Sequence, residues 1–277
     1  MTQDYTYKLR SGEALSVTTY GNNNLLDRPC LIFVHGFKGF KDWGFVPFLG
    51  EYFANSDFFV ITFNFSHNGI GENRLEFTEL EKFAENTFSK EIEELDDLVT
   101  AYKENYFGET KNDLIGLIGH SRGGGISILV AESNNNINAC ATWSAIANFD
   151  RYSERQKKSW RKNGFFEVLN SRTKQVMRLN TGLLEDLENN LDEKLNIERS
   201  LKKLEKPLLI IHGEQDLAVP LSEAEKIYSW ADGSNCEFVI IPKTGHTFDI
   251  KHPFEGSNEK FDRVLLETRS FFKKHLN

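Results

Sequence analysis

The residues of this 277-residue chain whose types could perform catalysis stand in three short motifs. Residues 119–123 are GHSRG, a match to G-x-S-x-G with Ser121 at its centre. Asp216 lies in HGEQDLAVP, and His246 lies in PKTGHTF. A serine hydroxyl is a weak nucleophile at neutral pH, and it needs a nearby base that a third group holds in the correct tautomer. The motifs therefore predict Ser121 as nucleophile, His246 as general base and Asp216 as the acid that orients it.

The surroundings of Ser121 strengthen this prediction. A strand predicted at Leu114–Ile118 runs directly into the motif, and a helix is predicted at Gly123–Glu132. The chain must therefore turn sharply so that the Ser121 hydroxyl stands clear of the sheet, and side chains on the flanking glycines would clash there. His67 is a rival base, but it precedes the serine, whereas the order Ser, Asp, His is the one expected for a serine in this strand-to-helix turn.

Apolar runs of strand length alternate with amphipathic helical stretches, which predicts a mostly parallel eight-stranded sheet with helices on both faces. Parallel strands are expected at Cys30–Val34, Phe58–Phe65, Leu114–Ile118, Cys140–Ile146, Leu208–Ile211 and Glu237–Ile241, with antiparallel edge strands at Tyr5–Leu9 and Leu15–Tyr20. Helices are expected at Phe45–Ala54, Ser89–Tyr106, Gly123–Glu132 and Glu259–Lys274.

One segment breaks this alternation. Between residues 150 and 206 there is no strand-like run, and charged residues are dense. We predict a core domain formed by residues 1–149 and 207–277, and a short helical cap inserted at residues 150–206. Its position after the sixth strand of the sheet would let the cap cover a site at the carboxyl ends of the strands.

Two features of the predicted cap bear on the substrate, and each has two interpretations. Trp160, Phe165, Phe166 and Met177 either line a substrate pocket or fix the cap to the core. The basic run at residues 155–162, RQKKSWRK, either steers an anionic substrate or forms a solvated helix face, which is the commoner role of such runs.

Composition narrows the class of protein. Hydrophobic residues make up 39% of the chain and aromatic residues 13%, which favours a folded protein with a large core. The net charge of −8 argues against a nucleic-acid partner, because phosphate binding needs a positive field. No apolar run approaches the length of a membrane helix and no secretory leader precedes the first strand, so we expect a cytoplasmic protein without a membrane partner.

The metal-binding and redox residue types show no clustering. Cys30, Cys140 and Cys236 each begin an apolar run, and their wide spacing predicts buried reduced thiols. The histidines lack the short spacing of a zinc site, so we expect neither a metal nor another cofactor. The expected partner is a small-molecule ester, and the oligomeric state stays open, a homodimer included.

The motifs HGF at residues 35–37, GHSRGG, HGEQDLAVP and TGHTF together resemble the α/β-hydrolase superfamily over nearly the whole chain. Within it, the short cap and the first two motifs are similar to bacterial carboxylesterases grouped with dienelactone hydrolases and cinnamoyl or feruloyl esterases. The resemblance implies an α/β-hydrolase fold and an oxyanion hole made by the backbone N–H groups of Phe37 and Arg122, whose side chains would then tolerate many changes. Asn64 departs from the pattern, because an aspartate is often found there.

We therefore expect a serine hydrolase that cleaves carboxylic esters with a small or aromatic acyl group through an acyl-Ser121 intermediate. Thioesterase, amidase or peptidase, and acyltransferase activities use the same triad and stay open. A prolyl-type peptidase would usually add a propeller or a larger cap, for which this chain has no room. The alternative of another class is a binding protein without catalysis, whose signature would be a degenerate triad.

Overall fold

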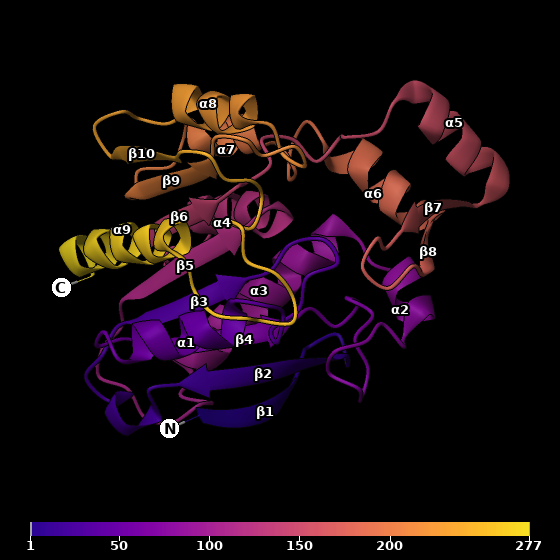
Figure 1. Ribbon diagram of the computed structural model, residues 1–277. Coiled ribbons are helices and arrows are strands. Elements are labelled where there is room, and N and C mark those ends of the chain that lie inside the picture. The colour runs from indigo at the N-terminus through magenta and orange to yellow at the C-terminus, as the bar shows by residue number, and fades with distance from the viewer. Residues whose placement is uncertain (1, 277) are drawn as a thin grey trace.

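The computed structural model describes residues 2–276, and an eight-stranded sheet runs through its centre (Figure 1). Across the sheet the order of strands is β1-β2-β4-β3-β5-β6-β9-β10. The antiparallel pairs are β1 with β2 and β2 with β4, and every neighbouring pair from β4 onwards is parallel. The strands are β1 (Thr2–Lys8), β2 (Ala14–Tyr20), β3 (Cys30–Val34), β4 (Phe59–Asn64), β5 (Ile115–His120), β6 (Ala139–Trp143), β9 (Leu208–Gly213) and β10 (Cys236–Ile241). The predicted fold class and all eight predicted strands are confirmed.

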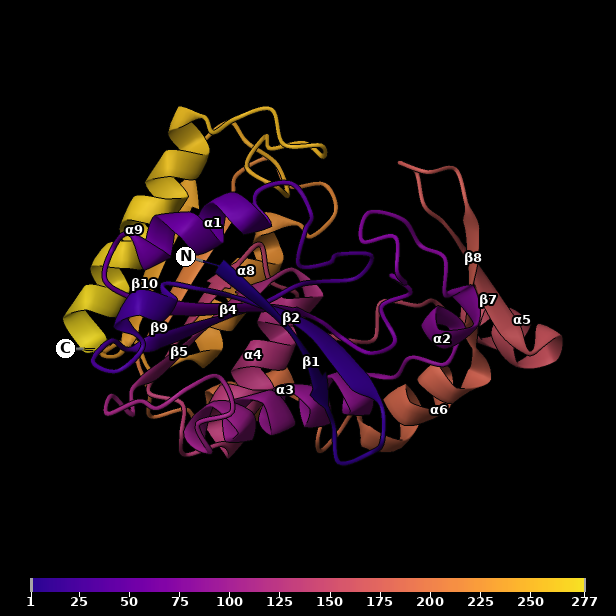
Figure 2. The ribbon, with the colours of Figure 1, turned by 90° about the horizontal axis from the view of Figure 1, so that it is seen from below.

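Helices cover both faces of this sheet. In Figure 2, α1 and α9 lie on one face, and α3 and α4 lie on the other. The α-helices are α1 (Val46–Ala54), α2 (Leu80–Ala84), α3 (Phe88–Lys103), α4 (Arg122–Ser133), α5 (Glu154–Asn163), α6 (Thr181–Asn190), α7 (Ile197–Leu201), α8 (Leu221–Trp230) and α9 (Glu259–His275). Among residues 2–276, no helix combines the length and the apolarity that crossing a bilayer requires. The four predicted helices are confirmed, whereas α8 was not predicted, because only Ala224 and Ile227 of its residues are buried.

The alternation of side chains along the strands builds two apolar layers. In β3, Leu31 and Phe33 pack with the residues of α1 and α9, whereas Cys30, Ile32 and Val34 pack with those of α3 and α4. Every residue of β3 is buried, as expected for a parallel strand that is covered on both faces. Because the central strands are continuously apolar, they can be predicted from the sequence.

The termini of the long helices are fixed by side-chain caps. The Thr87 side chain accepts a hydrogen bond from the backbone N–H of Lys90 at the start of α3. Asn258 accepts bonds from the N–H groups of Lys260 and Phe261 at the start of α9. Each cap satisfies N–H groups that have no partner within the helix. The buried face of α9 is the one that its sequence predicts: Phe261, Val264, Leu265, Thr268, Phe271 and Phe272.

The insertion at residues 150–206 is not wholly helical, which corrects the prediction. Besides α5, α6 and α7 it contains an antiparallel hairpin of β7 (Phe165–Leu169) and β8 (Val176–Asn180), which lies beside α2 and away from the main sheet (Figure 1). Each strand has only five residues and one covered face. In β8, Met177 and Leu179 are buried, whereas Val176 and Arg178 are exposed. Such short, half-polar strands leave no continuous apolar run in the sequence.

The prediction of buried thiols is confirmed for Cys30 and Cys140 but not for Cys236. All three are free thiols, with Cys30 and Cys140 buried and Cys236 half-buried. Burial raises the pKa of Cys140 to about 12, so this thiol stays protonated at neutral pH.

Candidate active site

The turn between β5 and α4 holds Ser121 in a strained backbone conformation. Its φ is 58° and its ψ is −121°, a region that side-chain-bearing residues rarely adopt. The strand ends at His120 and the helix begins at Arg122, so Ser121 occupies the single residue between them. This is the sharp strand-to-helix turn that the motif predicts.

The glycines on either side of Ser121 permit this turn. A Cβ on Gly123 would lie 2.2 Å from the carbonyl oxygen of Val34, and a Cβ on Gly119 would lie 2.4 Å from the carbonyl oxygen of Gly123. Both distances fall well inside van der Waals contact with backbone atoms that cannot move independently. The predicted clash is therefore confirmed, and Ser121 is held close to the end of β3.

Asp216 and His246 are brought together by the loops that follow β9 and β10. A hydrogen bond of 2.7 Å joins His246 Nδ1 to Asp216 Oδ2. The other carboxylate oxygen, Oδ1, accepts bonds from the backbone N–H groups of Ala218 and Val219 at 2.8 and 2.9 Å. Burial by itself would raise the pKa of Asp216, but the bonds from His246 and the two N–H groups outweigh it, and the pKa lies below its usual value. Asp216 is therefore a carboxylate that accepts from His246.

Two other histidines support these loops. His120 Nε2 is hydrogen-bonded to the carbonyl oxygen of His246 at 2.9 Å, and His212 Nε2 is bonded to that of Val219 at 2.8 Å. Burial, followed by the proximity of His246, lowers the pKa of His120 to about 3. The His120 ring is therefore neutral near pH 7 and fixes the loop that carries His246.

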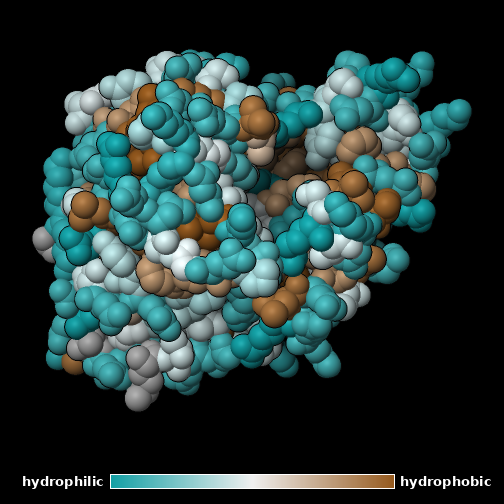
Figure 3. Space-filling view, viewed as in Figure 1, coloured by the Kyte–Doolittle hydropathy of each residue, from teal (hydrophilic) through white to brown (hydrophobic). Residues whose placement is uncertain are grey.

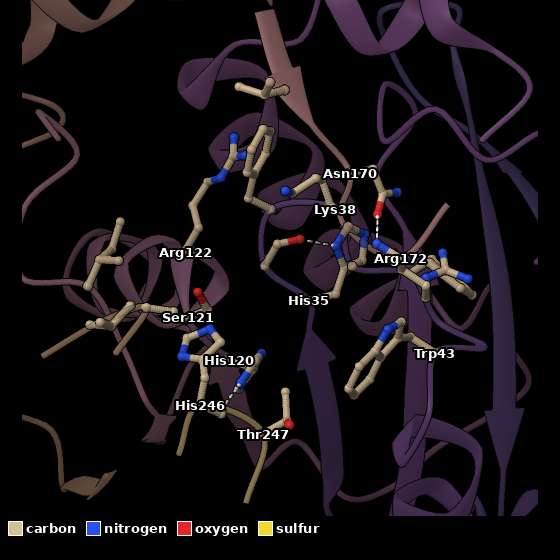
Figure 4. A pocket seen from close by; sticks show the side chains of 18 of the residues that line it. His35, Lys38, Trp43, His120, Ser121, Arg122, Asn170, Arg172, His246 and Thr247 are labelled. Atoms are coloured by element: carbon tan, nitrogen blue, oxygen red, sulfur yellow. Dashed lines mark hydrogen bonds between the residues drawn. The ribbon is translucent and has the colours of Figure 1, made fainter. Parts of the chain in front are cut away.

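A cavity of about 610 Å³ opens above Ser121 and His246. Figure 3 shows the surface hollowed between the sheet domain and the insertion, and in Figure 4 the side chains of Ser121 and His246 face the same space. The aromatic residues that line the cavity are Phe33, Phe37, Phe40, Trp43, Phe45, Phe88, Phe149 and Tyr152. Its hairpin wall is formed by Val168, Asn170, Ser171 and Arg172.

The loop after β3 packs directly against the turn at Ser121. A Cβ on Gly36 would lie 2.9 Å from Ser121 Cβ and 3.3 Å from the backbone nitrogen of Arg122. Asn64 Oδ1 anchors this loop by accepting from the backbone N–H of Lys41 at 2.7 Å. Asn64 thus supplies an acceptor at the position where the resemblance leads one to expect an aspartate.

His35 fixes the start of the same loop. Its Nε2 accepts from the backbone N–H of Phe65 at 3.2 Å, so its Nδ1 donates to the carbonyl oxygen of Gly36 at 2.9 Å. Burial lowers the pKa of His35 to about 4, which keeps the ring neutral and both bonds in place.

The side chain of Arg122 is not free to vary, which corrects the prediction for that residue. It is buried and forms an ion pair with the buried Glu91 at 3.2 Å. The guanidinium carbon lies 4.3 Å from the centre of the Phe37 ring and 5.3 Å from that of Phe88. Arg122 therefore joins the Phe37 loop to the start of α4 through its side chain.

None of the four predicted pocket residues lines the cavity. Trp160 and Met177 are each 1% exposed and belong to the apolar core, and Phe166 stacks on Trp160 with ring centroids 5.3 Å apart. Phe165 lies under the guanidinium of Arg178, 4.2 Å away. These side chains hold the insertion together, because a segment with little apolar surface of its own must bury what it has.

Two further expectations have clear outcomes, and two lining residues were not expected. His67 is hydrogen-bonded to Ser66 and lies outside the set of residues that line the cavity. The basic run at residues 155–162 is a helix face: Lys157 pairs with Asp150, and Arg161 pairs with Glu188. The sequence did not point to Lys38 or Arg172, which do line the cavity, because neither stands in a motif that carries a known chemical role.

The family of the chain is established by its sequence match. Residues 51–277 match the model of the prolyl oligopeptidase family. The chain belongs to this family. The match does not depend on a propeller domain, because all the matched residues lie in the sheet domain and its insertion. The chain matches no curated protein in sequence.

Solved structures share the fold at low sequence identity. The chain is similar to the α/β hydrolase GrgF from Penicillium sp. sh18, with a TM-score of 0.76, 17% identity and coverage of 100% of this chain and 99% of that one. It is similar to Est1E from Butyrivibrio proteoclasticus with ferulic acid bound, with a TM-score of 0.74, 20% identity and coverage of 98% and 99%. It is also similar to an esterase from Pyrococcus furiosus, with a TM-score of 0.67, 19% identity and coverage of 100% and 92%. The chain is a serine hydrolase of the α/β-hydrolase fold.

Replacing Gly123 by alanine should destabilise the protein. The added methyl group meets the backbone oxygen of Val34 at 2.2 Å, so the start of α4 must move. We expect a loss of about 2 kcal/mol or more in the free energy of unfolding, measured by urea denaturation. Gly182→Ala is the matched control, because a Cβ there meets nothing within 4 Å, and it should stay within about 1 kcal/mol of the wild type. Equal stability of the two variants would contradict the tight packing at the turn.

Arg122→Met should cost about 3–5 kcal/mol of stability, because it leaves the Glu91 carboxylate buried without its cation. Adding Glu91→Gln should restore most of that loss by removing the buried charge. Urea denaturation of the wild type, the single variant and the double variant measures both effects. If the double variant is as unstable as Arg122→Met, the uncompensated carboxylate is not the cause.

Proposed function

We propose that Ser121, His246 and Asp216 form a catalytic triad, and that the protein hydrolyses carboxylic esters with a small or aromatic acyl group through an acyl-Ser121 intermediate. The observation that carries the proposal is the 2.7 Å bond between His246 Nδ1 and Asp216 Oδ2, in a cavity that His246 shares with Ser121 on its strained turn. No other histidine that lines the cavity is bonded in this way to a carboxylate, within the part of the chain that the structure describes.

The bond to Asp216 sets the tautomer of His246. Because the carboxylate can only accept, Nδ1 carries a proton and Nε2 is left to accept one. In the proposed mechanism, Nε2 takes the proton of the Ser121 hydroxyl as its oxygen attacks the ester carbonyl carbon. Asp216 then stabilises the imidazolium, which returns the proton to the departing alkoxide. A water molecule, activated by His246 in the same way, releases the acid from Ser121.

The tetrahedral intermediate places a negative charge on the former carbonyl oxygen. We assign its stabilisation to the backbone N–H groups of Phe37 and Arg122. The N–H of Arg122 has no acceptor within its helix, because it belongs to the first turn of α4. The close packing of Gly36 on Ser121 brings the Phe37 loop to the same side of the nucleophile.

The cavity favours a compact substrate with an apolar part. Its volume of about 610 Å³ lies within the range typical of small-molecule sites, and aromatic rings form much of its lining. Est1E, which shares the fold, has been solved with ferulic acid bound. These observations support an aromatic or small acyl group.

Labelling of Ser121 tests the triad. A fluorophosphonate should add one adduct to the wild type and none to Ser121→Ala, as measured by intact-protein mass. Ser121→Ala and His246→Ala should each lower kcat for an activated ester by about 10⁵-fold or more, and Asp216→Asn by about 10⁴-fold, because the amide favours the wrong imidazole tautomer. Melting temperatures of the three variants serve as the folding control. An adduct on Ser121→Ala, or wild-type turnover by Asp216→Asn, would disprove the assignment.

A second candidate function is hydrolysis of an amide or peptide bond, which membership of the prolyl oligopeptidase family favours. The same triad serves both reactions, and only the leaving group differs. The test compares the 4-nitrophenyl ester of an aromatic acid with the 4-nitroanilide of the same acid. We expect the ester-to-anilide ratio of kcat/KM to exceed the ester-to-anilide ratio of the uncatalysed hydrolysis rates. An enzymatic ratio below the uncatalysed ratio would assign the protein to the peptidases of its family.

A further inference from the structure

We propose that the cavity selects esters whose acyl part ends in a carboxylate, and that Lys38 and Arg172 recognise this negative charge. This inference rests on the proposed esterase function and adds a substrate class to it. The two residues come from separate parts of the chain: Lys38 follows Phe37 in the loop after β3, and Arg172 lies in the turn of the hairpin.

The Lys, Arg, Asp and Glu side chains that line the cavity are all cationic. Four cationic side chains line it, namely Lys38, Arg122, Arg151 and Arg172, and none of its described lining residues is Asp or Glu. The chain as a whole carries a net charge of −8. A cationic cavity in an acidic protein attracts and retains anions, because the low-dielectric walls strengthen the local field.

Two of the four cations are already neutralised by the protein. Arg122 pairs with the buried Glu91, and Arg151 pairs with Glu223. Each pair returns the local charge to about zero. These two arginines therefore serve the structure of the site, and the unbalanced charge lies elsewhere.

The other two cations have no carboxylate partner within residues 2–276. Lys38 Nζ donates to the carbonyl oxygen of Leu169 at 3.1 Å, which leaves its charge unpaired. The Arg172 guanidinium carbon lies 5.5 Å from the centre of the Phe40 ring and 6.0 Å from that of Phe77. Burial, and then the charge of Arg122, lowers the pKa of Lys38. A bound anion would reverse this effect, because it favours the charged amine.

The hairpin turn adds a third donor without an acceptor. Asn170 lines the cavity, and its Oδ1 accepts from the backbone N–H of Arg172 at 3.2 Å. Its buried Nδ2 has no hydrogen-bond partner in the described part of the chain. This wall therefore offers charged donors from Lys38 and Arg172, with the unpartnered amide of Asn170 buried behind them, and a carboxylate is a group that accepts several hydrogen bonds at once.

The position of these donors indicates which part of the ester carries the charge. In Figure 4, Lys38, Asn170 and Arg172 lie across the cavity from Ser121 and His246. His246 must reach the oxygen of the leaving group, so the alcohol part lies beside it and the acyl part extends across the cavity. The carboxylate would then bind at the far end of the acyl group, remote from the scissile bond.

Two esters that differ only in this charge test the inference: the 4-nitrophenyl monoester of adipic acid and its distal methyl ester. Adipate is long enough to limit attack by its own carboxylate. We expect the wild type to show kcat/KM about tenfold or more higher for the free carboxylate, mainly through KM, because remote binding acts equally on ground and transition states. The preference should weaken as salt is added.

The charge ratio, the kcat/KM of the carboxylate over that of the methyl ester, is then measured within each variant. Lys38→Met and Arg172→Met should each lower the ratio about tenfold or more, whereas Arg172→Lys should retain part of it. Lys174→Met is the matched control, because it removes a positive charge from the same hairpin turn at a residue that does not line the cavity. If Lys174→Met lowers the ratio as far as Arg172→Met, a general field acts and the assigned site is wrong.

Calorimetric binding of both compounds to Ser121→Ala separates this inference from the proposed function. Tighter binding of the carboxylate, lost in Ser121→Ala combined with Arg172→Met, supports the anion site even if the wild type hydrolyses neither ester. Equal binding of the two compounds, with hydrolysis of both by the wild type, overturns the anion site and leaves the esterase function standing.

Discussion

The close approach of backbone to backbone at the turn between β5 and α4 is the constraint on which the rest of the site depends. Gly119 and Gly123 leave no room for a side chain, and Gly123 brings the first turn of α4 against the end of β3. Ser121 can keep its positive φ only because both sides of the turn are fixed in this way. The strain at Ser121 is offset by the strand and the helix that flank it, both of which are buried over most of their length.

The other parts of the site are held by polar contacts that are removed from water. His35, His120 and His212 are each fixed by a backbone carbonyl, and Asp216 is fixed by two backbone N–H groups. In such an environment a hydrogen bond is strong and an unpaired group is costly, so these contacts define loop positions that apolar packing alone would leave loose. The ion pair of Arg122 with Glu91 extends the same principle to the loop that carries Phe37.

The strands of the sheet and the residues of the proposed triad could be predicted from the sequence because their signals are local. Buried parallel strands such as β3 are continuous apolar runs, and the turn at Ser121 demands glycines at fixed positions. The hairpin could not be predicted, because β7 and β8 alternate between buried and exposed residues over only five positions. The cavity lining was misjudged for a related reason. Whether an apolar residue such as Trp160 faces a pocket or a core depends on how its helix packs against neighbouring elements, here against Phe166 of β7, and a local pattern does not encode that packing.

The net charge of the chain does not predict the electrostatic potential in the cavity either, because ion pairing decides which charges remain unbalanced. The basic run of α5 is conspicuous in the sequence, yet Lys157 and Arg161 are matched by carboxylates and lie outside the cavity lining. Lys38 and Arg172 are inconspicuous in the sequence, yet both line the cavity, and neither pairs with a carboxylate within residues 2–276. An unpaired cation in a partly dry cavity acts over a longer range than several paired cations on a surface. The electrostatic character of this cavity therefore follows from two isolated residues, and it opposes the sign of the whole chain.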